Sequence, residues 1–185
     1  MNRALLLTSL AALVTGAAVV AAPLSSGLKP GESVTPFHPK HLAGPLAGTS
    51  KCFPCTFQNR PQVQVWVNGD DAKNVTALAG TLSKAMKTYN GTEFKGLVVF
   101  VTTPQTAAKT EAFVRTAARN PALSGVGMAV IDSRDSAIEA YNINTAKDVR
   151  NTVIAYRDWK VADSFVNLTA ADTARLEKAI AGITK

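Results

Sequence analysis

Over its last two thirds, the 185-residue chain alternates short apolar runs with segments whose apolar residues recur at helical spacing. Short apolar runs of this kind are typical of strands buried inside a sheet. The pattern predicts strands at 63–67, 97–101 and 126–131, with helices over about 72–89 and 104–119 between them. Strands that alternate with helices favour a largely parallel sheet with helices on its faces, so the expected class is α/β.

The C-terminal part of the chain adds an antiparallel element to this sheet. Two further apolar runs, 152–156 and 161–166, are separated by four residues, which predicts a β-hairpin. A final helix is expected after Thr169, because Asp172 follows at capping-box spacing. The sheet should therefore be mixed but mainly parallel.

Two earlier helix starts also carry capping residues. Asp70 and Asp71 precede the first predicted helix, and an aspartate at such a position accepts hydrogen bonds from the first helical turn. At the second helix, Thr103 would be the N-cap and Pro104 the first helical residue, where proline is favoured.

Residues 23–61 have a different character, with seven prolines and four glycines. Each proline lacks a backbone donor and restricts the residue before it, so no long helix or central strand is expected there. In particular, residues 37–48 are not expected to form a buried strand. We expect an irregular N-terminal extension, poor in core residues, followed by one α/β domain over 62–185.

The first 22 residues are typical of a secretory signal peptide. A basic start is followed by an uncharged segment, Ala4–Ala22, which ends in small residues ahead of Pro23. The alternative is an uncleaved membrane anchor, because nineteen apolar residues can just span a bilayer. The expected location is therefore exported: periplasmic, extracellular or tethered to a membrane through this segment.

The charge of the chain argues against a nucleic-acid partner. The formal net charge is +7, and removal of the leader takes away one basic residue, Arg3. The remaining basic residues are scattered, whereas nucleic-acid binding needs cations clustered on one face.

The chain has two cysteines, and their spacing, Cys52-Phe-Pro-Cys55, is that of a redox couple. In such a pair one thiolate attacks a substrate disulfide and the other resolves the mixed disulfide. We expect Cys52 to attack, because it is the more N-terminal cysteine and lies next to Lys51. A purely structural disulfide that holds the extension to the core is the alternative.

Both histidines of the chain lie close to this pair. His38 and His41 precede Cys52 and Cys55 by about ten residues, and two imidazoles with two thiolates form a ligand set suited to Zn²⁺ or copper. The main hypothesis requires no cofactor. This metal site stays open as an alternative.

The order of elements and the dithiol resemble the thioredoxin-like fold in its redoxin or peroxiredoxin-type variant. The resemblance covers roughly residues 31–184, and the Cys52–Cys55 motif is similar to the active-site dithiol of that superfamily, down to the proline before the second cysteine. It implies a thiol-disulfide oxidoreductase that exchanges with protein thiols and disulfides or with a redox partner.

Two positions depart from the pattern of that superfamily. There the dithiol follows the first core strand, but the corresponding junction here, Asn68–Lys73, contains no cysteine. Residues 149–151 stand where the superfamily has a proline facing the dithiol. These departures favour the alternative of a non-catalytic binding or scaffold module that keeps the fold.

A peroxidase is a further alternative. Pro45, Thr49 and Cys52 have the spacing of the peroxiredoxin motif, and Arg150 is similar in placement to the arginine of that family. The resemblance would make Cys52 peroxidatic and Cys55 resolving. That motif normally follows a buried strand, which is not expected here, so thiol-disulfide exchange is the preferred hypothesis.

Overall fold

The computed structural model describes residues 24–185, so the predicted signal peptide at 1–22 lies outside the described residues. The strands are β1 (Lys40–Ala43), β2 (Gln62–Val67), β3 (Lys95–Thr102), β4 (Gly127–Asp132), β5 (Asn151–Arg157) and β6 (Lys160–Val166). The helices are α1 (Phe53–Phe57), α2 (Ala72–Thr88), α3 (Ala107–Ala117), α4 (Ser136–Ala140) and α5 (Thr173–Ile183). None of them is long and apolar enough to cross a membrane.

The six strands form one sheet in the order β1-β4-β3-β2-β5-β6. β2, β3 and β4 pair in parallel, β5 and β6 pair antiparallel as a hairpin, and β1 joins the other edge antiparallel to β4. The predicted α/β class with a mixed sheet is therefore confirmed. The sheet is less parallel than expected, because only the β2–β3 and β3–β4 pairings are parallel and the other three are antiparallel.

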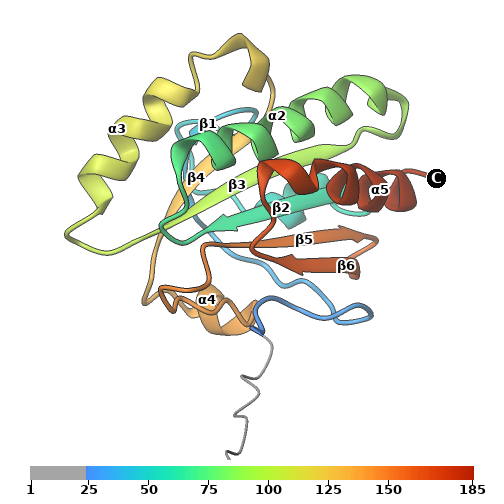
Figure 1. The fold of residues 1–185 in the computed structure, drawn as a ribbon. Coiled ribbons are helices and arrows are strands. Elements are labelled where there is room, and N and C mark those ends of the chain that lie inside the picture. Colours follow the sequence, from blue (N-terminus) through green and yellow to red (C-terminus); the bar gives the residue numbers. More distant parts are fainter. Residues whose placement is uncertain (1–23) are drawn as a thin grey trace, which may run out of the picture.

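Helices and irregular segments cover the two faces of the sheet (Figure 1). α2, α3 and α5 lie on one face, where β2 contributes Val63 and Val65 to the core. The other face is covered by α4, α1 and the N-terminal extension, and here β2 contributes Trp66. Trp66 is in the core as its place in an apolar run predicts, because alternate side chains of a strand point to opposite faces.

The N-terminal extension is more ordered than its composition predicts. It contributes several buried side chains to the second face: Leu28, Val34, Phe37, Leu46 and Phe53. The expectation that it is poor in core residues is wrong. Residues 37–48 contain the short strand β1, which lies at the sheet edge and has one buried residue, so no buried strand forms there, as expected. At an edge, the flanking prolines remove no central ladder bond.

A second part of the extension covers the opposite edge of the sheet. Gly31 donates from its backbone to Val161, and the amide of Val34 donates to the Trp159 carbonyl, so the extension lies along β6. An uncovered edge strand invites pairing with another chain. The extension thus covers β4 on one side, by adding β1, and β6 on the other, by residues 31–34.

The helix starts are partly as the sequence predicts. Asp71 is the N-cap of α2 and accepts from the amide of Asn74, and Thr169 and Asp172 form the predicted capping box. The expectation for Thr103 is wrong. Residues 103–106 form a turn, and α3 begins at Ala107 with no side-chain cap. The hydroxyl of Thr106 turns back to Thr103, so the cap-like pattern stabilises the turn instead of the helix.

Candidate functional site

Cys52 and Cys55 form a disulfide at the start of α1, with their Cα atoms 5.2 Å apart. Cys52 is the N-cap, and its Sγ accepts a hydrogen bond of 3.1 Å from the amide of Cys55. Pro54 occupies the first helical turn, where its missing amide hydrogen costs nothing. Cys52 is buried while Cys55 is exposed. Of the two cysteines, Cys55 is therefore the one that solvent reaches.

Two phenylalanines attach α1 to the sheet. Phe53 is fully buried, and its ring packs edge-on against Phe57, with 4.7 Å between centroids. The Phe53 ring also lies where a side chain on Gly127, the first residue of β4, would stand. The amine of Lys95 lies 5.4 Å above the Phe57 ring. The disulfide is thus held by an aromatic anchor on the face of the sheet that carries α4.

The two histidines support the loop before the disulfide instead of joining the sulfurs. Nε2 of His41 contacts the carbonyl oxygen of Lys51 at 2.9 Å, and Nδ1 of His38 contacts that of Ser50 at 3.1 Å. Between residues 24 and 185, no three His, Cys, Asp or Glu side chains group so that they could hold a metal ion. The predicted His38–His41–Cys52–Cys55 set for Zn²⁺ or copper is not assembled, because the sulfurs bond each other and the imidazoles face backbone carbonyls.

Burial favours the neutral form of His41. Its side chain is buried, and burial lowers the pKa of His41 more than the hydrogen bond to the Lys51 carbonyl raises it. A carbonyl oxygen can only accept, so Nε2 carries the ring proton. Nδ1 is left as a buried acceptor with no partner in the structure. A second proton would have to enter at Nδ1, where nothing compensates the charge.

This burial predicts a loss of stability in mild acid. A histidine in the unfolded chain titrates near its ordinary pKa of about 6.5, whereas native His41 takes up its proton at lower pH. Below pH 6.5 the unfolded state binds more protons, so the free energy of unfolding should fall by up to about 1.4 kcal/mol per pH unit until the native pKa is reached. Urea unfolding at pH 8 and pH 5 measures this loss.

A matched pair of variants isolates the effect. His41→Gln should remove this part of the pH dependence, whereas His38→Gln, at an exposed histidine of the same segment, should keep it. An equal pH dependence in both variants would contradict the assignment to His41.

Arg150 lies far from the disulfide along the sheet. Its carbonyl accepts from the amide of Asn68, just beyond the carboxyl end of β2. α1 is bound at the opposite end, where the Gln62 side chain donates to the carbonyl of Gln58. The six residues of β2 separate these ends by roughly 17 Å, at about 3.3 Å per residue. The structure does not bring the predicted Arg150 and Cys52 together.

The other residue of the peroxidase hypothesis has a local role. The hydroxyl of Thr49 donates to the carbonyl of Leu46 and accepts from the amide of Lys51, so it stabilises the turn before the disulfide. Neither Thr49 nor Arg150 therefore contributes a free donor beside Cys52.

The junction between β2 and α2 is filled by a polar network that sequence reasoning missed. The carboxylate of Asp70 accepts from the side-chain amides of Asn74 and Asn151, each at 2.6 Å. Both amides also donate to the carbonyl of Leu168, and the Leu168 amide donates back to Asn151. The sequence shows polar residues at these places, but their pairing joins segments some 80 residues apart.

Comparison with known proteins establishes the fold. The sequence matches no known protein family and no curated protein, but many solved structures share its architecture. The chain has the thioredoxin-like fold, as the sequence resemblance predicts, and its structural neighbours include redoxins and peroxiredoxins.

Three of these neighbours can be superposed on this chain over nearly their whole length. A provisionally assigned thiol:disulfide interchange protein, DsbE, from Chlorobium tepidum superposes with a TM-score of 0.61 and 14% identity, covering 85% of this chain and 99% of its own. A provisionally assigned protein disulfide isomerase from Bacteroides thetaiotaomicron gives 0.62 and 11%, covering 87% and 94%. Peroxidoxin BcpB from Mycobacterium tuberculosis gives 0.56 and 17%, covering 84% and 96%.

Proposed function

We propose that this chain takes part in thiol-disulfide exchange through Cys52 and Cys55. The observation that supports the proposal is the disulfide itself, closed across two residues and presented with Cys55 exposed on a thioredoxin-like scaffold. The sequence predicts Cys52 as the attacking thiol. Its burial favours the reverse order, in which Cys55 reacts first with a partner and Cys52 resolves.

The exchange of the oxidised form with a partner dithiol has two steps. A partner thiolate attacks Sγ of Cys55, the Cys52–Cys55 bond breaks, and Cys52 leaves as a thiolate next to the amide of Cys55. The second partner thiol, as its thiolate, then attacks the mixed disulfide and releases Cys55. The partner becomes oxidised, and two protons from solvent complete the two cysteine thiols.

Single-cysteine variants test the order of reaction. In Cys52→Ser the remaining thiol is exposed, and in Cys55→Ser it is buried. We expect Cys52→Ser to form a mixed disulfide with an aromatic disulfide reagent at least ~tenfold faster, because access limits thiol reactivity. The rate is followed by absorbance of the released thiolate. Equal rates would contradict the assignment of Cys55 as the first reacting residue.

The wild-type protein tests the exchange itself. It should reduce insulin in the presence of dithiothreitol, and its pair should be reduced by millimolar dithiothreitol under native conditions. Replacement of both cysteines by serine serves as the control. A pair that resists reduction while the protein stays folded would leave a structural disulfide.

The setting of this exchange is proposed from the leader at residues 1–22. An exported protein works where disulfides persist, so the partners would be protein thiols or disulfides outside the cytoplasm, or a dedicated redox partner. The mass of the mature protein after secretion would locate the cleavage site. An unchanged mass would favour the membrane-tethered alternative.

A second candidate, a non-catalytic binding or scaffold module, is favoured by the junction after β2. The place where the superfamily resemblance expects the dithiol is occupied by Asp70, whose carboxylate already accepts three hydrogen bonds. In this alternative the disulfide only holds α1. A phenotype of the double serine variant that appears without loss of folding would favour the redox function over this candidate.

A further inference from the structure

A groove lies beside the junction between β2 and α2, outside the disulfide site. It has a volume of about 320 Å³ and lies between the start of α2 and the inner side of α3, at the carboxyl ends of β2 and β3. Crevices at the carboxyl ends of parallel strands are common ligand sites in α/β proteins. This volume is near the lower limit of known ligand pockets, so it suits a small molecule.

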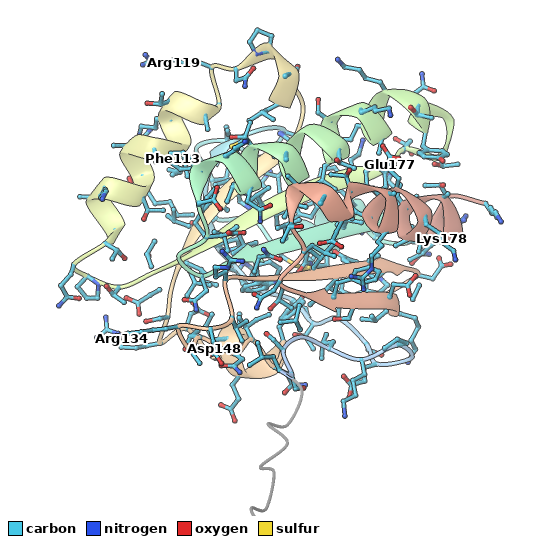
Figure 2. All side chains as sticks on the ribbon, viewed as in Figure 1. Phe113, Arg119, Arg134, Asp148, Glu177 and Lys178 are labelled. Atoms are coloured by element: carbon cyan, nitrogen blue, oxygen red, sulfur yellow. A yellow bond between two sulfur atoms is a disulfide. The ribbon has the colours of Figure 1, made fainter. Side chains whose placement is uncertain are left out.

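The body of the groove is apolar. Its apolar lining includes Val67 at the end of β2, Val75 in the first turn of α2, Phe100 on β3 and Phe113 on α3. The rings of Phe100 and Phe113 pack edge to face with 5.9 Å between centroids. Phe113 is half-buried, and Figure 2 shows it on the side of α3 that faces α2. An apolar body placed between these walls would remove them from water, which favours binding.

The groove exists because α3 packs only lightly on the rest of the protein. Val114 is the one fully buried residue of α3. The helix packs mainly against β4 and β1 and not against α2. Thr106 and Thr110 therefore face the groove and are not covered by a neighbouring helix.

Two charged side chains line the groove, Asp70 and Lys109. The Asp70 carboxylate accepts from the amide of Asp71 and from the side chains of Asn74 and Asn151, so its oxygens are already occupied. Lys109 forms no ion pair with any residue that the structure describes. Its ammonium is the charge in the groove that a ligand can still satisfy.

We propose that this groove binds a small amphipathic monocarboxylate, with its apolar body between Phe100 and Phe113 and its carboxylate at Lys109. A single lysine matches a single negative charge. The amino end of α2 also borders the groove but is already capped by the carboxylate of Asp71, so the attraction for an anion comes from Lys109. The site is independent of Cys52 and Cys55, so the oxidised and reduced proteins should bind alike.

The probe for this site is decanoate, a straight-chain carboxylate, with decanol as its uncharged counterpart. Titration of the ¹⁵N-labelled full chain below the micellar concentration should give saturable chemical-shift changes at Gly69, Lys109 and Phe113. Decanol should bind about three- to fivefold more weakly, because it lacks the charge that meets Lys109. A residue-level readout separates the groove from any association with the apolar leader.

Three variants make the test specific. Lys109→Met should weaken decanoate about three- to fivefold and leave decanol unchanged. Lys178→Met removes a similarly exposed lysine on α5, which Figure 2 places away from Phe113, and should change neither. Thr110→Phe should fill the groove and abolish the binding of both decanoate and decanol. A Tm equal to that of the wild type would show that this variant is folded.

Three results would overturn the proposal. The first is equal affinity for decanoate and decanol with no effect of Lys109→Met, which would mean a groove without charge recognition. The second is a set of shifts confined to residues outside the groove. The third is saturable binding of a peptide with apolar side chains where decanoate shows none, which would assign the groove to a protein partner. An aromatic acid such as phenylacetate, run in parallel, distinguishes aromatic from aliphatic carboxylates.

Discussion

Replacing Phe53 by alanine is expected to lower the free energy of unfolding by about 3–5 kcal/mol, the range for removing a fully buried phenylalanine. Phe53 has no exposed surface and joins α1 to the sheet beside Gly127. Loss of the ring leaves a cavity between α1 and β4. Because α1 has only five residues, it has few other side chains that could fill this cavity. Urea unfolding at pH 8 measures the change.

The same substitution should act on the disulfide. Cys52 is buried because α1 is held against the sheet, so a loosened α1 should expose its sulfur and speed reduction by dithiothreitol. Phe53→Leu is the matched control, since it keeps most of the volume and should cost less than about 1.5 kcal/mol. A Phe53→Ala protein with wild-type stability and reduction rate would show that α1 is not anchored by this ring.

The second large effect is expected at Asn151. Asn151→Ala should lower the free energy of unfolding by about 2–4 kcal/mol, because it leaves buried polar groups without partners. Its side chain donates to Asp70 and Leu168 and accepts from the Leu168 amide, and the residue is 1% exposed. Thermal or urea unfolding tests this prediction.

The control for Asn151 is an asparagine of the same size at the surface. Asn59→Ala is exposed and should change the stability by less than about 0.5 kcal/mol. A loss below 1 kcal/mol at Asn151 would mean that water replaces the hydrogen bonds of its side chain at the junction. A large loss supports a structural role for the network at the junction.

Most of the fold could be predicted from local pattern. The predicted apolar runs coincide with β2, β3, β4, β5 and β6 within one or two residues. Such runs can be recognised locally, because a strand buried in a sheet needs apolar residues along its own length. β1 escaped prediction since its proline-rich surroundings carry no strand pattern. The start of α3 was misplaced because Thr103 and Pro104 suit a turn as well as a helix start.

The candidate site was predictable as residues but not as an arrangement. Spacing alone showed that Cys52 and Cys55 can bond, since three residues on a helical turn bring their Cα atoms to 5.2 Å. It could not show that Cys52 is buried, because that depends on Phe53 reaching β4, more than 70 residues later. The role of His41 was missed for a similar reason, since its partner is a backbone carbonyl that sequence patterns do not reveal.

The sequence by itself determined the α/β class, the mixed sheet and the presence of a Cys-x-x-Cys pair ahead of the first core strand. These follow from periodicity, proline chemistry and spacing, which act over a few residues. The tertiary structure alone decided that the disulfide lies on the α4 face at the opposite end of β2 from Arg150, and that Asp70, Asn74 and Asn151 close the junction. These features join segments that are far apart in the chain, and their energy comes from burial and hydrogen bonds that exist only once the sheet has formed.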